Sequence, residues 1–208
     1  MSEADQHPQV YLITPPEFEL SVFPNQLAQV LDRNQVACVR LTMATTDEDK
    51  ISRAADACRE VCHARDIALV LDTHIMMVER LGLDGVHLND GARSVRKVRK
   101  DLGDDAIVGA YCKASRHDGM TAAEAGADYV SFGPVGETPL GDGTRAEADL
   151  FQWWSEMIET PVVAEGALSL DVIRQMAPIT DFFAIGQEVW QTDEPADILA
   201  QMQAAMQV

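Results

Sequence analysis

Short apolar runs and helical stretches alternate along the whole of this 208-residue chain. The apolar runs, rich in β-branched residues, span residues 10–14, 36–42, 67–72, 85–89, 106–112, 129–135, 161–167 and 182–187. Such short, continuous runs predict parallel strands buried on both faces. Stretches with helical periodicity follow them at residues 25–33, 47–65, 74–82, 94–103, 119–127, 149–158, 169–178 and 195–206. This alternation predicts an α/β fold, a closed (β/α)8 or TIM barrel.

The chain is expected to form one domain over residues 1–208. Hydrophobic residues make up 47% of it, and no flexible linker or block of charge divides it. A doubly wound open sheet is the alternative, but its GxGxxG fingerprint does not follow the first predicted strand. The sequence has no apolar run of 18 residues and no signal-like N-terminus, so we expect a cytoplasmic protein with no membrane partner.

The chain is strongly acidic, with 34 acidic and 16 basic residues and a formal net charge of -18. Nucleic acids and anionic membranes are polyanions, so neither is an expected partner. A small anionic ligand would need local cations or backbone N–H groups.

The four cysteines of the chain are Cys38, Cys58, Cys62 and Cys112. They lack zinc-finger spacing and are expected to be core thiols. The alternative is a redox or metal pair at Cys58 and Cys62.

In a (β/α)8 barrel the functional groups lie at the carboxyl ends of the strands and in the loops after them. The candidates at these positions are Arg40, Asp72, His87, Asp90, Cys112, Lys113, Glu165 and Gln187. The loops after the seventh and eighth strands often hold phosphate in such barrels. We therefore expect small phosphorylated metabolites as partners.

Three segments in order along the chain narrow this expectation: LGLDGVHLND (81–90), GADYVSFGPVGETP (126–139) and PVVAEGAL (161–168). They resemble the GADGVHLGQ, GADYxxxGPVFxT and PVVAIGGI segments of the thiamine-phosphate synthase family, which includes the thiazole tautomerases. The resemblance covers nearly the whole chain. It implies a transferase of thiamine biosynthesis that joins hydroxymethylpyrimidine diphosphate to thiazole phosphate and releases diphosphate, with Mg2+ as cofactor.

Arg40 is the residue retained from the family's strand-2 signature Q-x-R-x-K, whose glutamine and lysine fall on Cys38 and Thr42. An arginine here either binds phosphate or forms an ion pair at the barrel mouth. Glu165 replaces an apolar residue of the family. Because a carboxylate facing the phosphate would repel it, Glu165 is expected to pair with Arg40 or to act as an acid or base.

The metal-binding aspartates of the family are displaced in this chain. The Asn-Asp pair after the third strand falls on Asp72 and Thr73, and the second aspartate falls near Ala92, with Asp90 the nearest carboxylate. Either Asp72 and Asp90 share Mg2+, or the metal site has been lost. Asp72 is also suited to cap a helix.

His87 is retained from the family's GVHL segment. It either contacts a phosphate, moves a proton, or is a hydrogen-bonded core histidine. Lys113, with Arg116 and His117, forms a basic cluster that indicates an anionic ligand or an exposed basic loop. Lys113 is also the candidate Schiff-base lysine of an aldolase-type barrel enzyme. The proton-shuttling histidine of the tautomerases has no matched position, since His117 lies beyond the strand.

The loop GPVGETPLGDGTR (133–145) matches the family's GPVFxTxTK, whose threonines and lysine close over two phosphates. Thr138 keeps the first threonine position, while Leu140 and Gly141 replace the second threonine and the lysine. Arg145, four residues on, is the cation placed to reach back. The glycines of this loop either allow it to close as a lid or make it merely a mobile connection.

The loops after the last two strands best preserve the family's phosphate cup. Gly166 and Ala167 match a Gly-Gly turn, and Gly186 and Gln187 match a Val-Ser pair. Small residues here let backbone N–H groups approach a phosphate. We expect this half of the site to bind a monophosphate.

The resemblance therefore implies a thiamine-phosphate synthase-like protein whose diphosphate and metal site is degenerate. One alternative is a catalytically silent or regulatory barrel that binds a phosphorylated metabolite, and another is a thiazole tautomerase-like isomerase. Trp153 and Trp154, with Phe151, are expected either to pack in the core or to make a subunit contact in a homo-oligomer.

Overall fold

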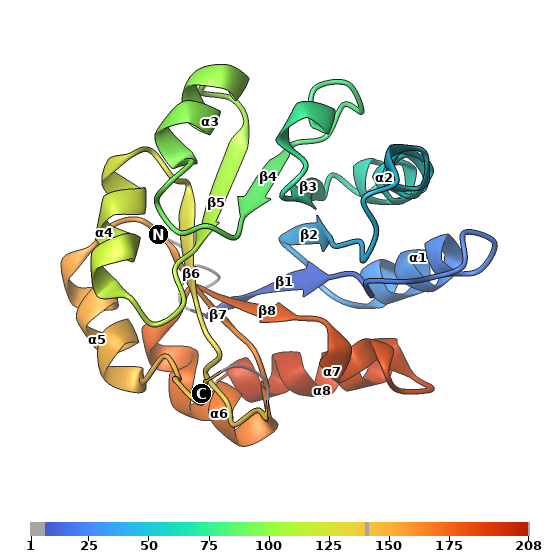
Figure 1. Ribbon diagram of the computed structural model, residues 1–208. Coiled ribbons are helices and arrows are strands. Elements are labelled where there is room, and N and C mark those ends of the chain that lie inside the picture. Colours follow the sequence, from blue (N-terminus) through green and yellow to red (C-terminus); the bar gives the residue numbers. More distant parts are fainter. Residues whose placement is uncertain (1–6, 140–141, 208) are drawn as a thin grey trace.

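The structure, a computed structural model, describes residues 7–139 and 142–207. Within these residues, eight parallel strands close into a barrel in sequence order, with β1 paired to both β2 and β8 (Figure 1). The strands are β1 (Gln9–Ile13), β2 (Cys38–Leu41), β3 (Ala68–Asp72), β4 (Gly85–Leu88), β5 (Ile107–Tyr111), β6 (Tyr129–Phe132), β7 (Val162–Glu165) and β8 (Phe182–Ile185). The predicted (β/α)8 barrel is confirmed.

Helices surround the strands and cover the outside of the barrel (Figure 1). They are α1 (Phe23–Arg33), α2 (Glu48–His63), α3 (Val95–Leu102), α4 (Arg116–Glu124), α5 (Ala148–Met157), α6 (Leu170–Met176), α7 (Gln187–Trp190) and α8 (Pro195–Met206), with the 3-10 turns η2 (Ile75–Met77) and η3 (Ala177–Ile179). The short α7, between β8 and α8, was not expected from the sequence.

The helix expected over residues 74–82 is not formed; this connection contains the single 3-10 turn η2. Thr73 enters the connection with φ of 63°, and Gly82 leaves it with φ of 62°. Left-handed residues cannot continue a right-handed helix, so any helix here is confined to residues 74–81, of which Ile75–Met77 form η2. Asp72 is the last residue of β3 and His74 occupies the N-cap position of η2, so the interpretation of Asp72 as a helix cap is wrong.

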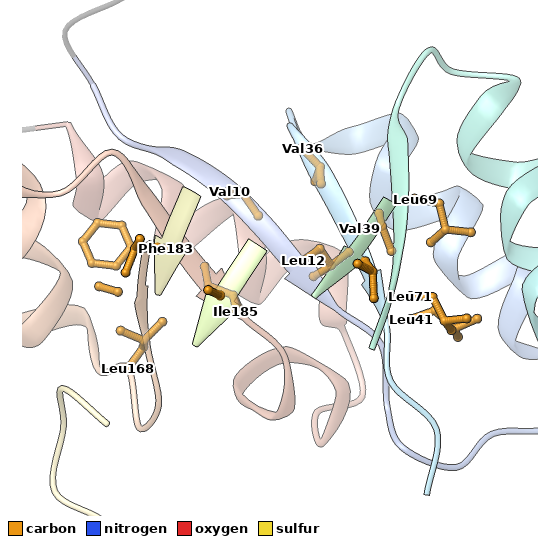
Figure 2. Packing of buried hydrophobic residues seen from close by; sticks show 14 of the residues in the cluster. Val10, Leu12, Val36, Val39, Leu41, Leu69, Leu71, Leu168, Phe183 and Ile185 are labelled. Atoms are coloured by element: carbon orange, nitrogen blue, oxygen red, sulfur yellow. The ribbon is translucent and has the colours of Figure 1, made fainter. Parts of the chain in front are cut away.

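Alternate residues of each strand face opposite sides of the barrel wall. Those that face outward pack against the helices, as Figure 2 shows for Val10, Leu12, Leu69 and Leu71. Those that face inward form a second apolar cluster inside the barrel: Tyr11, Val70, Tyr129, Val163 and Ala184. The same alternation places five polar residues inside the barrel, toward the carboxyl ends of the strands: Arg40, Asp72, His87, Ser131 and Glu165.

Cys58 and Cys62 are free thiols buried on α2. Burial raises the pKa of each to about 12, so both stay protonated at neutral pH. The expectation that these cysteines are core thiols is confirmed.

Within the described part of the chain, no helix has both the length and the apolar character that a bilayer crossing requires.

Candidate active site at the carboxyl end of the barrel

Arg40 and Glu165 form an ion pair across the inside of the barrel mouth. Arg40 Nη1 lies 3.2 Å from Glu165 Oε2, and the Ser131 hydroxyl donates to the same oxygen at 2.6 Å. The two charged side chains are 8% and 16% exposed, so the pair lies largely out of solvent. The expected pairing of Glu165 with Arg40 is therefore present, and it accounts for a carboxylate at a position that is apolar in the resembled family.

Arg40 keeps its charge despite this burial. Desolvation is the largest single influence and would lower the pKa of the guanidinium, but Glu165, together with Tyr11, Tyr129 and Asp72, outweighs it and holds the pKa above the usual value. The Nε–H of Arg40 is buried and has no hydrogen-bond partner among the described residues. Because such a donor is costly to leave unpaired, it marks a position where a ligand oxygen would be favourable.

His87 lies directly beneath Arg40 and is completely buried. Its Nε2 is 2.6 Å from Arg40 Nη1 and its Nδ1 is 2.9 Å from the Tyr129 hydroxyl. Arginine can only donate, so Nε2 must accept, and the proton lies on Nδ1, which donates to Tyr129. Burial, and then the charge of Arg40, lower the pKa of His87 well below its ordinary value, so the ring is neutral. This arrangement is that of the hydrogen-bonded core histidine, not of a residue facing a ligand.

Two tyrosines continue this chain of contacts into the barrel. The hydroxyls of Tyr129 and Tyr11 lie 2.5 Å apart, and burial raises the pKa of both phenols. Gly109 makes room for the Tyr129 ring, because a Cβ at this position would lie 2.0 Å from Tyr129 Cζ. Sequence reasoning overlooked both tyrosines and Ser131, although their inward strand positions were a usable signal.

Asp72 also lies at the mouth, at the end of β3. Its carboxylate accepts hydrogen bonds from the Asn89 amide at 2.5 Å and from the Thr42 hydroxyl at 3.4 Å. Burial raises the pKa of Asp72, and the positive charge of Arg40 opposes this shift. Asp90 is exposed on the loop after β4, where it accepts from the Ser94 hydroxyl at 2.5 Å.

The loops after β6 and β7 are bonded to each other at the mouth. The N–H of Val135 donates to the carbonyls of Glu165 and Gly166 at 3.1 and 3.2 Å, and that of Gly136 donates to Gly166 at 3.0 Å. Gly136 has to be small, since a Cβ here would lie 1.8 Å from the Ala167 carbonyl oxygen. Gly166 and Ala167 both have positive φ, of 90° and 55°. This turn is thus rigidly held beside the mouth.

The expected cup for a monophosphate contains a carboxylate of the chain itself. Gly186 directly follows β8, and exposed Gln187 opens α7. The Glu188 carboxylate accepts from the N–H of Leu168 at 3.1 Å and from the N–H of Gly186 at 3.0 Å. It thereby joins the loops after β7 and β8. Sequence reasoning did not consider Glu188, whose position two residues after Gly186 was the available signal.

The basic residues after β5 and β6 are only partly available for a ligand. Arg116 lies over the Trp153 ring at 4.1 Å, and Arg145 pairs with Glu137 and Glu147 at 3.8 and 3.4 Å. A cavity of about 370 Å³ in the loop after β6 is lined by Pro134, Glu137, Thr138, Gly143, Thr144 and Arg145. Leu140 and Gly141 lie outside the described residues.

Lys113 and His117 are exposed, and Lys113 follows β5 with φ of 53°. Trp154 and Phe151 are completely buried, so core packing is confirmed for these two rings. Trp153 is half-buried beneath Arg116. The basic cluster expected from the sequence is thus divided, with its arginine held against α5 and its lysine turned to solvent.

A family model described as thiamine monophosphate synthase matches residues 10–186, from β1 to the turn after β8. The chain belongs to this family. Two proteins named thiamine-phosphate synthase are similar to it over most of their lengths. That of Rhodospirillum centenum is 39% identical over 183 residues, 87% of this chain and 88% of that protein. That of Erythrobacter litoralis is 35% identical over 206 residues, 96% of each.

Solved structures agree with the fold. The thiamine phosphate pyrophosphorylase of Pyrococcus furiosus superposes with a TM-score of 0.82 over 98% of each chain, at 17% sequence identity. At this identity the likeness supports the barrel and its topology. The family resemblance inferred from the three sequence segments is confirmed by the family match and the curated relatives.

Proposed function

We propose that this chain catalyses the thiamine-phosphate synthase reaction, in which hydroxymethylpyrimidine diphosphate is joined to a thiazole and diphosphate is released. The observation that carries the proposal is the state of Arg40. It faces inward from β2 at the barrel mouth, remains charged, and has a buried Nε–H without a partner among the described residues. A guanidinium with a free donor is suited to bind a diphosphate oxygen.

The reaction exchanges one bond for another. The bond between the pyrimidine methylene carbon and a diphosphate oxygen breaks, and the oxygen keeps the electron pair. The thiazole nitrogen then donates its lone pair to the carbon, which forms the new C–N bond. Arg40 would stabilise the departing diphosphate, while the carboxylates of Asp72 and Glu165 at the mouth would favour the positive charge on the pyrimidine.

Asp72 fits a magnesium ion that is bound mainly by the substrate. Mg2+ prefers oxygen ligands and is often held by one or two carboxylates together with substrate phosphates. Among residues 7–139 and 142–207, no three His, Cys, Asp or Glu side chains group as a metal cage. Asp72 would therefore supply the protein ligand, with Asp90 at the rim, and Mg2+ would neutralise charge on the departing diphosphate.

One observation favours a second candidate, a barrel that binds the heterocycles without joining them. Arg40 is already paired with Glu165, and Glu188 already accepts from the N–H of Gly186 in the cup and from the N–H of Leu168 beside it. A buried phosphate that lacks one of its charged partners is bound more weakly by about 2 to 5 kcal/mol. Because carboxylates of the chain already pair with these groups, the site would bind the diphosphate group of the substrate weakly and would catalyse the reaction slowly.

The deciding experiment is a direct assay of condensation. Purified protein is incubated with hydroxymethylpyrimidine diphosphate, thiazole phosphate and Mg2+, and thiamine phosphate is measured as its fluorescent thiochrome derivative. We expect product, and an initial rate at least tenfold lower for Arg40→Gln than for the control Arg53→Gln, which removes an exposed arginine of α2. Ligand-induced thermal stabilisation without product would instead support the second candidate.

A further inference from the structure

The two carboxylate oxygens of Glu165 have different surroundings. Oε2 accepts from the Ser131 hydroxyl at 2.6 Å and from Arg40 Nη1 at 3.2 Å. Oε1 has no hydrogen-bond partner among the described residues, and it is not one of their buried side-chain atoms left without a partner. Since an unpaired oxygen that is not buried is reached by solvent, Oε1 is an open acceptor at the barrel mouth.

The position of this oxygen is fixed by the groups around the Glu165 side chain. Gly133, after β6, makes room for it, because a Cβ at this position would lie 3.1 Å from Glu165 Cγ. The Tyr111 hydroxyl donates to the carbonyl of the same Gly133 at 2.7 Å, so its proton is not available to Oε1. With Oε2 held by Ser131 and Arg40, the carboxylate presents Oε1 in a defined direction.

An open carboxylate oxygen beside an arginine matches a ligand that carries a hydrogen-bond donor beside an anion. An ionised carboxylate only accepts hydrogen bonds, and a guanidinium only donates them. The pyrimidine of thiamine has an amino group on the ring carbon next to the one that bears the methylene. In the diphosphate substrate a donor therefore lies beside the departing oxygen, and Glu165 Oε1 and Arg40 stand in the same relation.

From this geometry we infer that Glu165 is a specificity-determining residue, whose Oε1 accepts a hydrogen bond from the amino group of the pyrimidine. The inference rests on the proposed function and adds no bond change to the reaction. As the methylene carbon loses the diphosphate oxygen, the amino nitrogen shares the positive charge through the ring, so its hydrogen bond to a carboxylate strengthens. A ring with a carbonyl oxygen in place of the amino group would set two acceptors against each other.

Glu165→Gln changes the chemistry of this one position and keeps its shape. Arg40 only donates, so the amide oxygen must take the place of Oε2, and the amide nitrogen then takes that of Oε1. The variant therefore presents a donor where the wild type presents an acceptor. It should lose the preference for the amino ring and accept the carbonyl ring instead.

The test measures binding of two pyrimidine alcohols by calorimetry, one with the amino group and one with a carbonyl in its place. Neither alcohol carries a diphosphate, so the result depends neither on turnover nor on magnesium. We expect the wild type to bind the amino ring at least tenfold more tightly, and this ratio to fall at least tenfold in Glu165→Gln. Glu194→Gln, which replaces an exposed carboxylate before α8, is the matched control and should keep the wild-type ratio.

A wild type that binds both rings equally, or neither, overturns the inference, and this comparison needs no variant. An unchanged ratio in Glu165→Gln, with the circular dichroism spectrum of the wild type, overturns it as well. Failure of the wild type to form thiamine phosphate, with its selection of the amino ring intact, would refute the proposed function and leave the role of Glu165 standing.

Discussion

Arg40 and Glu165 meet at 3.2 Å although 125 residues separate them in sequence. One comes from β2 and the other from β7, and both project into the barrel near its carboxyl end. Ser131 and His87 extend the contact on either side. This buried ion pair connects β2 to β7 at the mouth of the barrel. It also determines which charged groups a substrate meets there.

Removing one partner of this pair should be costly. Glu165→Leu leaves the Arg40 charge buried without a carboxylate, and we expect the free energy of unfolding to fall by about 3 kcal/mol. The double variant Arg40→Leu/Glu165→Leu should recover at least half of this loss, since neither charge remains. Urea unfolding followed by circular dichroism measures both. A loss below about 1 kcal/mol in the single variant would show that the pair contributes little.

Gly109→Ala should destabilise the barrel by about 1 to 3 kcal/mol, because the added Cβ would lie 2.0 Å from the Tyr129 ring. The cost should shrink when Tyr129→Ala is introduced as well, since the smaller residue frees the space. Urea unfolding of the two single variants and the double variant gives the coupling energy. Additive effects would contradict the contact.

The buried, neutral His87 should make the protein lose stability in mild acid. Its folded-state pKa is depressed, so below the ordinary histidine value of 6.5 the unfolded chain binds one more proton than the folded chain. Stability is therefore fully present above pH 6.5 and declines below it, by about 1.4 kcal/mol per pH unit for this group alone.

Urea unfolding between pH 7 and pH 5 checks this slope. The variant His87→Gln should show a shallower decline, whereas His117→Gln, which removes an exposed histidine, should follow the wild type. Parallel curves for the wild type and His87→Gln would mean that the ring takes up its proton in the folded state.

Asp72 and Asp90 should differ in their effect on magnesium dependence. Asp72 lies inside the mouth near Arg40, whereas Asp90 is exposed and bonded to Ser94. We expect Asp72→Asn to raise the Mg2+ concentration for half-maximal condensation at least tenfold, and Asp90→Asn to raise it less than threefold. Initial rates over a magnesium titration measure this. Equal effects would place both acids at the metal.

The fold follows from local pattern. Buried strands and amphipathic helices alternate with a regular period, and each unit is specified by residues close in sequence, so the barrel could be inferred before any contact was seen. The ion pair of Arg40 with Glu165 was one of two interpretations of Glu165. Residues 74–82 escaped this reasoning, because a helical period of apolar residues does not reveal the left-handed turns at Thr73 and Gly82.

The arrangement of the site depends on closure of the barrel, because closure brings inward side chains of different strands together. It places Arg40 beside both Glu165 and His87 and stacks His87 on Tyr129. It also brings the turns after β7 and β8 close enough for one carboxylate, Glu188, to bond both. Sequence alone determined which residues of a strand share a face, since this depends on a two-residue period. Their partners and charge states depend on distances between strands remote in the chain, which only the tertiary structure sets.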